Sequence, residues 1–158
     1  ESSAASDVYK RQTHGEPSEN NAHPHISDDY NVVGVHNGII ENYQELKDKL
    51  VKNGYEFYSS TDTEVAIKLI DYYYKKYEHT PVDAINHAMV RIRGSYAFAI
   101  MFKEYPNEIY VARKDSPMIL GVSVATAMLA LMYRLYLIIQ EMYIILAIWR
   151  LDVLQMVI

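Results

Sequence analysis

Apolar residues recur along the chain with two different spacings, and each spacing predicts a type of element. A three-to-four residue spacing predicts three amphipathic helices. They span 41–53, 64–77 and 81–92. Short apolar runs bounded by turn residues predict strands at 32–36, 55–58, 95–102 and 108–112, the last two joined as a hairpin around Tyr105–Asn107. The 158 residues, half of them apolar, are enough for one domain with a core, of the α+β class.

The stretch Val32–Asn42 combines strand and turn signals most sharply. Its apolar run stops at Asn37–Gly38, and an acid-led helix follows, so we expect strand, corner and helix. Such a corner can present the Asn37 side-chain amide and the Gly38 backbone N–H together, as two donors for a carbonyl oxygen that becomes an oxyanion. Asn-Gly is also a common structural turn, so this stretch alone leaves both interpretations open.

Two polar segments carry further candidate chemistry. Residues 13–25 form a Gly, Pro and Asn-rich loop, whose histidines with His36 could converge on a metal ion. No helical HExxH spacing supports a metal, which makes hydrogen bonding the preferred role. In the polar corner 59–64, Thr61 or Asp62 could cap the next helix, or Asp62 could bind an ammonium group.

Charge and cysteine content exclude several classes of function. The net charge of -5 lacks the basic footprint of a nucleic-acid-binding protein. The absence of cysteine excludes disulfides, thiolate metal sites and a cysteine nucleophile within these residues. The polar stretch 1–12 has no secretory signal pattern, so we expect a cytoplasmic protein.

Four motifs, taken in order, resemble one family. They are Thr13–Ser18, Asn21–His25, Val35–Asn42 and Ser60–Glu64. Their order and spacing resemble the class II glutamine amidotransferase domain of the glucosamine-6-phosphate synthase family, from residue 13 to about 122. Other class II families share the His-Asn-Gly corner, but the Asn-Ala-His-Pro-His loop points to this one.

The resemblance implies a four-layer αββα sandwich of the N-terminal-nucleophile hydrolase type. It implies that Asn37 and Gly38 form the oxyanion hole, that Asp62 holds the α-ammonium group of glutamine, and that Thr13 and His14 line the glutamine pocket. In the intact parent enzyme, sugar-phosphate isomerase domains receive the ammonia and transfer it to fructose-6-phosphate. No cofactor, metal, membrane or nucleic acid is implied.

The sequence departs from the family at its start. The family nucleophile is an amino-terminal cysteine, and these residues contain none. Where the family has Arg-Trp-Ala before the Thr-His-Gly motif, Lys10–Gln12 stand here, in a segment that resembles a translated transposon end used in DNA sequencing. We therefore expect residues 1–12 to be adapter-derived or disordered, residues 13–122 to be a partial glutaminase domain, and the chain to be inactive.

The last segment, 123–158, is almost wholly apolar from Val124 on. A membrane-anchored binding domain is one interpretation, although two central charges would each cost about 2.5 to 3.5 kcal/mol in a bilayer. Read one base out of phase, Met132–Tyr133 must encode Val and Met156–Val157 must encode Gly, and permitted codons elsewhere give a sequence similar to the family's continuation. We expect a frame-shifted tail with no packed place in the fold. A histidine-based metal hydrolase is the other alternative.

Overall fold

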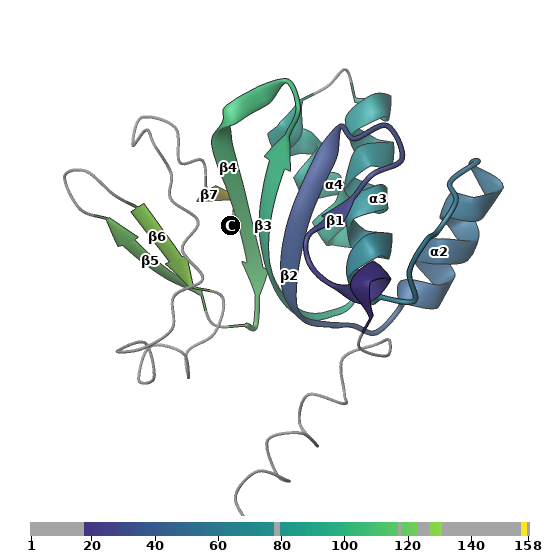
Figure 1. Ribbon diagram of the computed structural model, residues 1–158, viewed down its shortest axis with the longest axis horizontal. Helices are drawn as coiled ribbons and strands as arrows, with labels where there is room; N and C mark the ends of the chain where they lie inside the picture. Colours follow the sequence, from purple (N-terminus) through teal and green to yellow (C-terminus); the bar gives the residue numbers. More distant parts are fainter. Residues whose placement is uncertain (1–17, 78–79, 117, 123–126, 131–155, 158) are drawn as a thin grey trace, which may run out of the picture.

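The computed structural model describes residues 18–77, 80–116, 118–122, 127–130 and 156–157, and the structural statements below concern these residues. A 3-10 turn, η1, and strands and helices follow along the chain (Figure 1). Their bounds are η1 Glu19–Asn21, β1 His25–Ile26, β2 Val32–Ile40, α2 Tyr43–Lys52, α3 Asp62–Lys76, α4 Pro81–Arg91, β3 Gly94–Phe102, β4 Tyr105–Lys114, β5 Ile119–Val122, β6 Ala127–Ala130 and β7 Met156–Val157.

The main sheet has the strand order β1-β2-β3-β4-β7. Its pairs are antiparallel except for β4 with β7. Helices α3 and α4 lie against one face of this sheet, and α2 packs beside α3 (Figure 1). β5 and β6 form a separate antiparallel pair. The fold is therefore α+β, as the sequence predicts.

The alternation of side chains along the central strands divides the apolar residues between two faces. Large residues of β3, including Phe98, Ile100 and Phe102, point toward the helices and join the main core. Small or aliphatic residues such as Ala99 and Val111 form a second cluster on the opposite face. Burial on both faces makes β3 the centre of the domain.

The three predicted helices are confirmed, and their ends follow from capping chemistry. Thr61 caps α3 by accepting a hydrogen bond from the Glu64 N–H at 3.3 Å, which decides between the two predicted caps. Pro81 opens α4, where its missing N–H costs nothing. Gly54, with φ +88°, follows the end of α2.

The predicted corner at Asn37–Gly38 is wrong, because strand β2 continues through both residues to Ile40. Gly38 stands opposite Tyr96 of β3 in the continuous register. Its φ is +136°, and a Cβ at this position would overlap the Ser95 carbonyl oxygen. The glycine therefore lets two strands approach closely where the chain has an unusual backbone conformation.

The predicted strand at 55–58 is also wrong, since this segment pairs with no strand in the described part of the chain. Its backbone instead binds a side chain of α3: the Tyr58 and Ser59 N–H groups donate to the Glu64 carboxylate at 3.0 and 2.7 Å. A buried carboxylate thus replaces the hydrogen bonds that a neighbouring strand would supply.

Two parts of the segment 124–158 are described, and both are strands. β6 pairs with β5, and β7 pairs with the edge strand β4 at Val111 and Ala112. β6 thus lies in a pair separate from the main sheet, and β7 adds two residues beyond β4 at the edge of that sheet. Neither is a central strand of the main sheet, so the expectation that the segment has no packed place stays a prediction. The other residues after 122 lie outside the described ranges. Within the described part, no helix is both long enough and apolar enough to span a membrane.

Two glycines with positive φ differ in the space around them, which gives a matched test of the β2–β3 contact. Replacing Gly38 by Ala should lower the free energy of unfolding by about 3 kcal/mol or more, through backbone strain and overlap with Ser95. Replacing Gly54, where no atom lies within 4 Å of the position that a Cβ would take, should cost only about 1 kcal/mol. Urea unfolding of both variants measures the difference. Equal losses would contradict the close approach of the two strands.

Candidate functional site

The first turn of α3 lies against the end of strand β2, and this contact brings Asp62 to the candidate site. Asp62 is 5% exposed, and its Oδ2 accepts a hydrogen bond from the Ile40 N–H at 2.9 Å. Ile40 lies two residues beyond Gly38 on the same strand. The predicted residues Asn37, Gly38 and Asp62 therefore come from one strand end and the helix start bonded to it.

Asn37 and Gly38 are both half-buried and lie opposite Ala97 and Tyr96 of β3. Because the strand continues through them, they are held by the register of the sheet rather than by a turn. The other two predicted site residues, Thr13 and His14, lie outside the described residues.

The hydroxyl groups on either side of Asp62 each contact imidazole rings. Thr63 Oγ1 lies 3.0 Å from His36 Nδ1 and 3.2 Å from His23 Nε2. Thr61 Oγ1 lies 3.0 Å from His25 Nε2. The predicted hydrogen-bonding role of the loop histidines is thus confirmed for His23 and His25.

His36 occupies the helix-facing side of β2. It is 5% exposed and stacks on Phe98 with ring centroids 4.6 Å apart. Its Nδ1 is 4.0 Å from Asp62 Oδ1, and its buried Nε2 has no hydrogen-bond partner among the described residues. The face of the ring therefore packs on an aromatic side chain, while its Nδ1 contacts polar groups.

A second cluster, centred on the buried Lys68, supports the same helix turn and was not found by the sequence analysis. Lys68 Nζ lies 2.7 Å from both Glu64 Oε1 and Asp28 Oδ1, and it also donates to the Glu56 carbonyl. The Lys68 side chain is 1% exposed. Glu64 and Lys68 stand four residues apart in an otherwise apolar stretch, and this spacing was the available signal.

Burial controls the charge of the histidines around Asp62. Desolvation lowers the pKa of His36 to about 4, although the nearby Asp62 carboxylate acts in the opposite direction. Burial likewise lowers the pKa of His23 and of His25. All three imidazoles are therefore neutral at pH 7 and act as hydrogen-bonding groups. In the described part of the chain, no group of three or more potential ligands could hold a metal ion.

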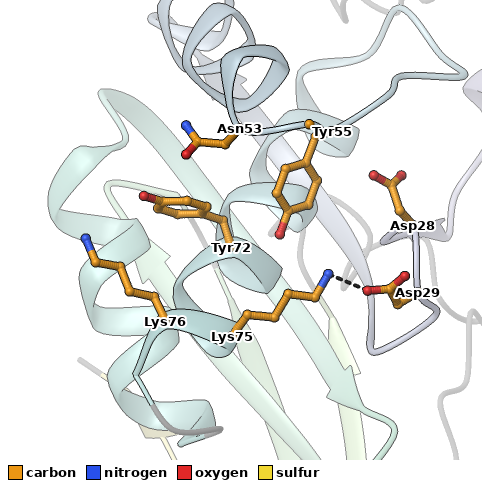
Figure 2. Close-up of a pocket in the computed structure, with 8 residues that line it drawn as sticks. Asp28, Asp29, Asn53, Tyr55, Tyr72, Lys75 and Lys76 are labelled. Atoms are coloured by element: carbon orange, nitrogen blue, oxygen red, sulfur yellow. Dashed lines mark ion pairs between the residues drawn. The ribbon is translucent and has the colours of Figure 1, made fainter.

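A surface hollow of about 450 Å³ lies elsewhere, between the end of α2 and the face of α3 (Figure 2). Lys75 projects into it and pairs with Asp29 at 2.5 Å and with Asp71 at 2.8 Å. Tyr55 donates to Asp71 at 2.8 Å. Since these charges are paired within the protein and the residues predicted for catalysis do not line the hollow, it does not belong to the candidate site.

The sequence profile of a family described as "Glutamine amidotransferase domain" matches residues 10–130. The chain belongs to the glutamine amidotransferase domain family. The matched region includes Asn37, Gly38 and Asp62 and every helix of the described structure.

Named relatives carry the same assignment. The glutamine–fructose-6-phosphate aminotransferase (isomerizing) of Clostridium acetobutylicum is 50% identical over 111 residues, covering 70% of this chain and 18% of the relative. The enzyme of the same name from Pyrococcus horikoshii is 47% identical over 115 residues, with the same two coverages. The chain thus spans about a fifth of the length of these relatives. The resemblance to the glucosamine-6-phosphate synthase family is confirmed.

Solved structures agree on the fold. A glutamine phosphoribosylpyrophosphate amidotransferase from B. subtilis, complexed with ADP and GMP, matches with a TM-score of 0.54 and 30% identity, covering 66% of this chain and 23% of that one. A structure described as the allosteric regulatory enzyme of purine biosynthesis matches with a TM-score of 0.54 and 31% identity, covering 67% and 23%. The amidotransferase domain therefore has the expected N-terminal-nucleophile hydrolase type of α+β fold.

The low pKa of His36 predicts an acid-sensitive amidotransferase domain. The unfolded imidazole takes up its proton near pH 6.5 and the folded one only near pH 4, so the unfolded state binds more protons between these values. The contribution of His36 to the free energy of unfolding is fully present above pH 6.5. It falls by about 3 kcal/mol as the pH is lowered toward 4. Urea unfolding at a series of pH values measures the slope.

One substitution isolates the contribution of His36. The slope should be shallower in His36→Gln than in the unmodified chain, because the Gln side chain takes up no proton in this pH range. An unchanged slope in His36→Gln would show that this ring does not control the acid sensitivity.

Proposed function

We propose that this chain supplies the oxyanion-stabilising and ammonium-binding part of a glutaminase site. In this proposal Asn37 and Gly38 donate to the γ-carbonyl oxygen of glutamine, and Asp62 holds the α-ammonium group. Thr13 and His14 line the glutamine pocket in the same proposal. The observation that carries the proposal is the hydrogen bond from the Ile40 N–H to Asp62, which joins the carboxylate to the strand of the two donors.

The chemistry of amide hydrolysis explains the choice of these groups. A nucleophile that attacks the γ-amide pushes negative charge onto its oxygen, and neutral donors fixed before the reaction stabilise that charge without reorganising. At the other end of glutamine, a carboxylate recognises the α-ammonium by charge-assisted hydrogen bonds. Asp62 Oδ2 accepts a hydrogen bond from the Ile40 N–H, and Oδ1 of the same carboxylate lies 4.0 Å from His36 Nδ1.

The nucleophile in this proposal comes from outside the 158 residues, because they contain no cysteine. We assign residues 13–122 to the partial glutaminase domain, 1–12 to an adapter-derived or disordered segment, and 123–158 to a frame-shifted tail. The parent protein would pass ammonia to fructose-6-phosphate on its isomerase domains, a role supported by the names of the relatives. Resequencing the coding DNA across Thr13 and Ser123 tests these boundaries.

The chain as given should release no ammonia from glutamine, because donors stabilise a transition state that needs a nucleophile to form. Addition of the family's amino-terminal segment with its leading cysteine, together with the restored reading frame after Ser123, should produce ammonia release. A coupled ammonia assay on both proteins measures this. Release by the unmodified chain would contradict the proposal.

In that completed domain, Asn37→Ala should lower kcat by about 10²-fold to 10³-fold, the usual effect of losing one oxyanion donor, with a smaller effect on KM. The matched control is Asn53→Ala, since Asn53 lies just after α2 and its side chain donates to the Lys49 carbonyl at 2.8 Å. Unimpaired turnover by Asn37→Ala would refute the role of this side chain.

A further inference from the structure

Asp62 sits between two threonines whose hydroxyl groups are both used by imidazoles. Thr61 contacts His25, and Thr63 contacts His23 and His36. Thr61, Asp62 and Thr63 are all buried, with at most 7% exposed. The position of the carboxylate is therefore fixed by the hydrogen bonds that its two neighbouring threonines make with the histidines, and by its own hydrogen bond from the Ile40 N–H.

On the Thr63 side, a proton count restricts the rings. The hydroxyl has one hydrogen, but it lies within hydrogen-bond distance of two imidazole nitrogens, His36 Nδ1 at 3.0 Å and His23 Nε2 at 3.2 Å. It can donate to only one of them, so the other nitrogen must carry a hydrogen and donate to Thr63. The two neutral rings are thus coupled through a single hydroxyl.

On the Thr61 side, a series of hydrogen bonds links His25 to the Glu64 carboxylate through two hydroxyl groups. Tyr58 Oη accepts from the Ile26 N–H and lies 3.0 Å from His25 Nδ1. Thr61 Oγ1 lies 3.0 Å from His25 Nε2 and 2.9 Å from Ser59 Oγ, which donates to Glu64 Oε2 at 2.5 Å. A proton on His25 Nε2 allows each hydroxyl of this series to donate to the next group: Tyr58 to His25, Thr61 to Ser59, and Ser59 to Glu64.

We propose that three histidines are positioning residues for the Asp62 carboxylate, because they hold the threonines on either side of it. The three are His23, His25 and His36. The proposal rests on the proposed function, in which Asp62 holds the α-ammonium of an amino acid. The loop from Ala22 to His25 and strand β2 both lie far from α3 in the sequence. Their contacts therefore hold the first turn of the helix to other parts of the fold and oppose its fraying, whereas a cap made by Thr61 alone is local to the helix.

The Ile40 amide reports on this arrangement in the chain as it exists, because its N–H donates to Asp62. In a ¹⁵N-labelled sample, Thr63→Val should shift the Ile40 amide resonance and raise its hydrogen-exchange rate by about tenfold. Thr63→Ser keeps the hydroxyl and should restore the rate to within about twofold of the original. Thr80→Val is the matched control, since Thr80 precedes α4 without a side-chain capping bond and should change neither quantity.

An unchanged Ile40 amide in Thr63→Val would overturn the proposal, and so would a Thr63→Ser variant that behaves like Thr63→Val. If Thr63→Val does not fold, the unmodified chain decides through its imidazole ¹⁵N signals. The proposal requires a hydrogen on His36 Nδ1 or on His23 Nε2, because Thr63 can donate to only one of the two nitrogens. Hydrogens on His36 Nε2 and His23 Nδ1 together would overturn it.

These measurements contain no glutamine, so they separate the inference from the proposed function. Failure of the completed domain to bind or hydrolyse glutamine would overturn the proposed role of Asp62. It would leave the Ile40 and imidazole signals as they are.

Discussion

One short polar turn, buried at the start of α3, determines how the rest of the described structure fits together. Thr61, Asp62, Thr63 and Glu64 are buried, and a buried polar group is costly unless it is hydrogen-bonded. Each of these side chains therefore has partners from another part of the chain: the loop at 22–25, the end of β2, or the segment 55–59. Because these polar groups need hydrogen bonds, the three segments are held in fixed positions against the start of α3, which apolar packing alone would not specify.

The same turn explains why the candidate site lies where it does. The large apolar side chains of α3 set the helix on the sheet, while the hydrogen bond from Ile40 fixes where its first residue stands along β2. The buried Lys68 balances Glu64 at the next turn, and removal of one partner from such a buried pair is strongly destabilising. The carboxylate of Asp62 is thus held from several sides by the fold itself.

Local pattern predicted much of this structure from the sequence, because helices and hairpins depend on neighbouring residues. The three helices follow from periodicity and strands β3 and β4 from short apolar runs, while residue type left Thr61 and Asp62 as the two candidate caps of α3. Two expectations failed where distant contacts decide: the close approach of Ser95 keeps Gly38 within a strand, and Glu64 binds the backbone at 58–59 in place of a partner strand. The roles of the histidines depend on threonines that lie 27 to 40 residues away in the sequence, so spacing could suggest hydrogen bonding but not its partners.

The central claim, that glutamine spans from the Gly38 region to Asp62, is tested most directly by NMR on the completed domain with its leading cysteine replaced by alanine. L-Glutamine should shift the Gly38 and Ile40 amide resonances together. An analogue that lacks the α-amino group, 4-carbamoylbutanoate, should shift Gly38 and leave Ile40 nearly unchanged. Identical Ile40 shifts with both compounds, or glutamine binding that moves neither amide, would contradict the account.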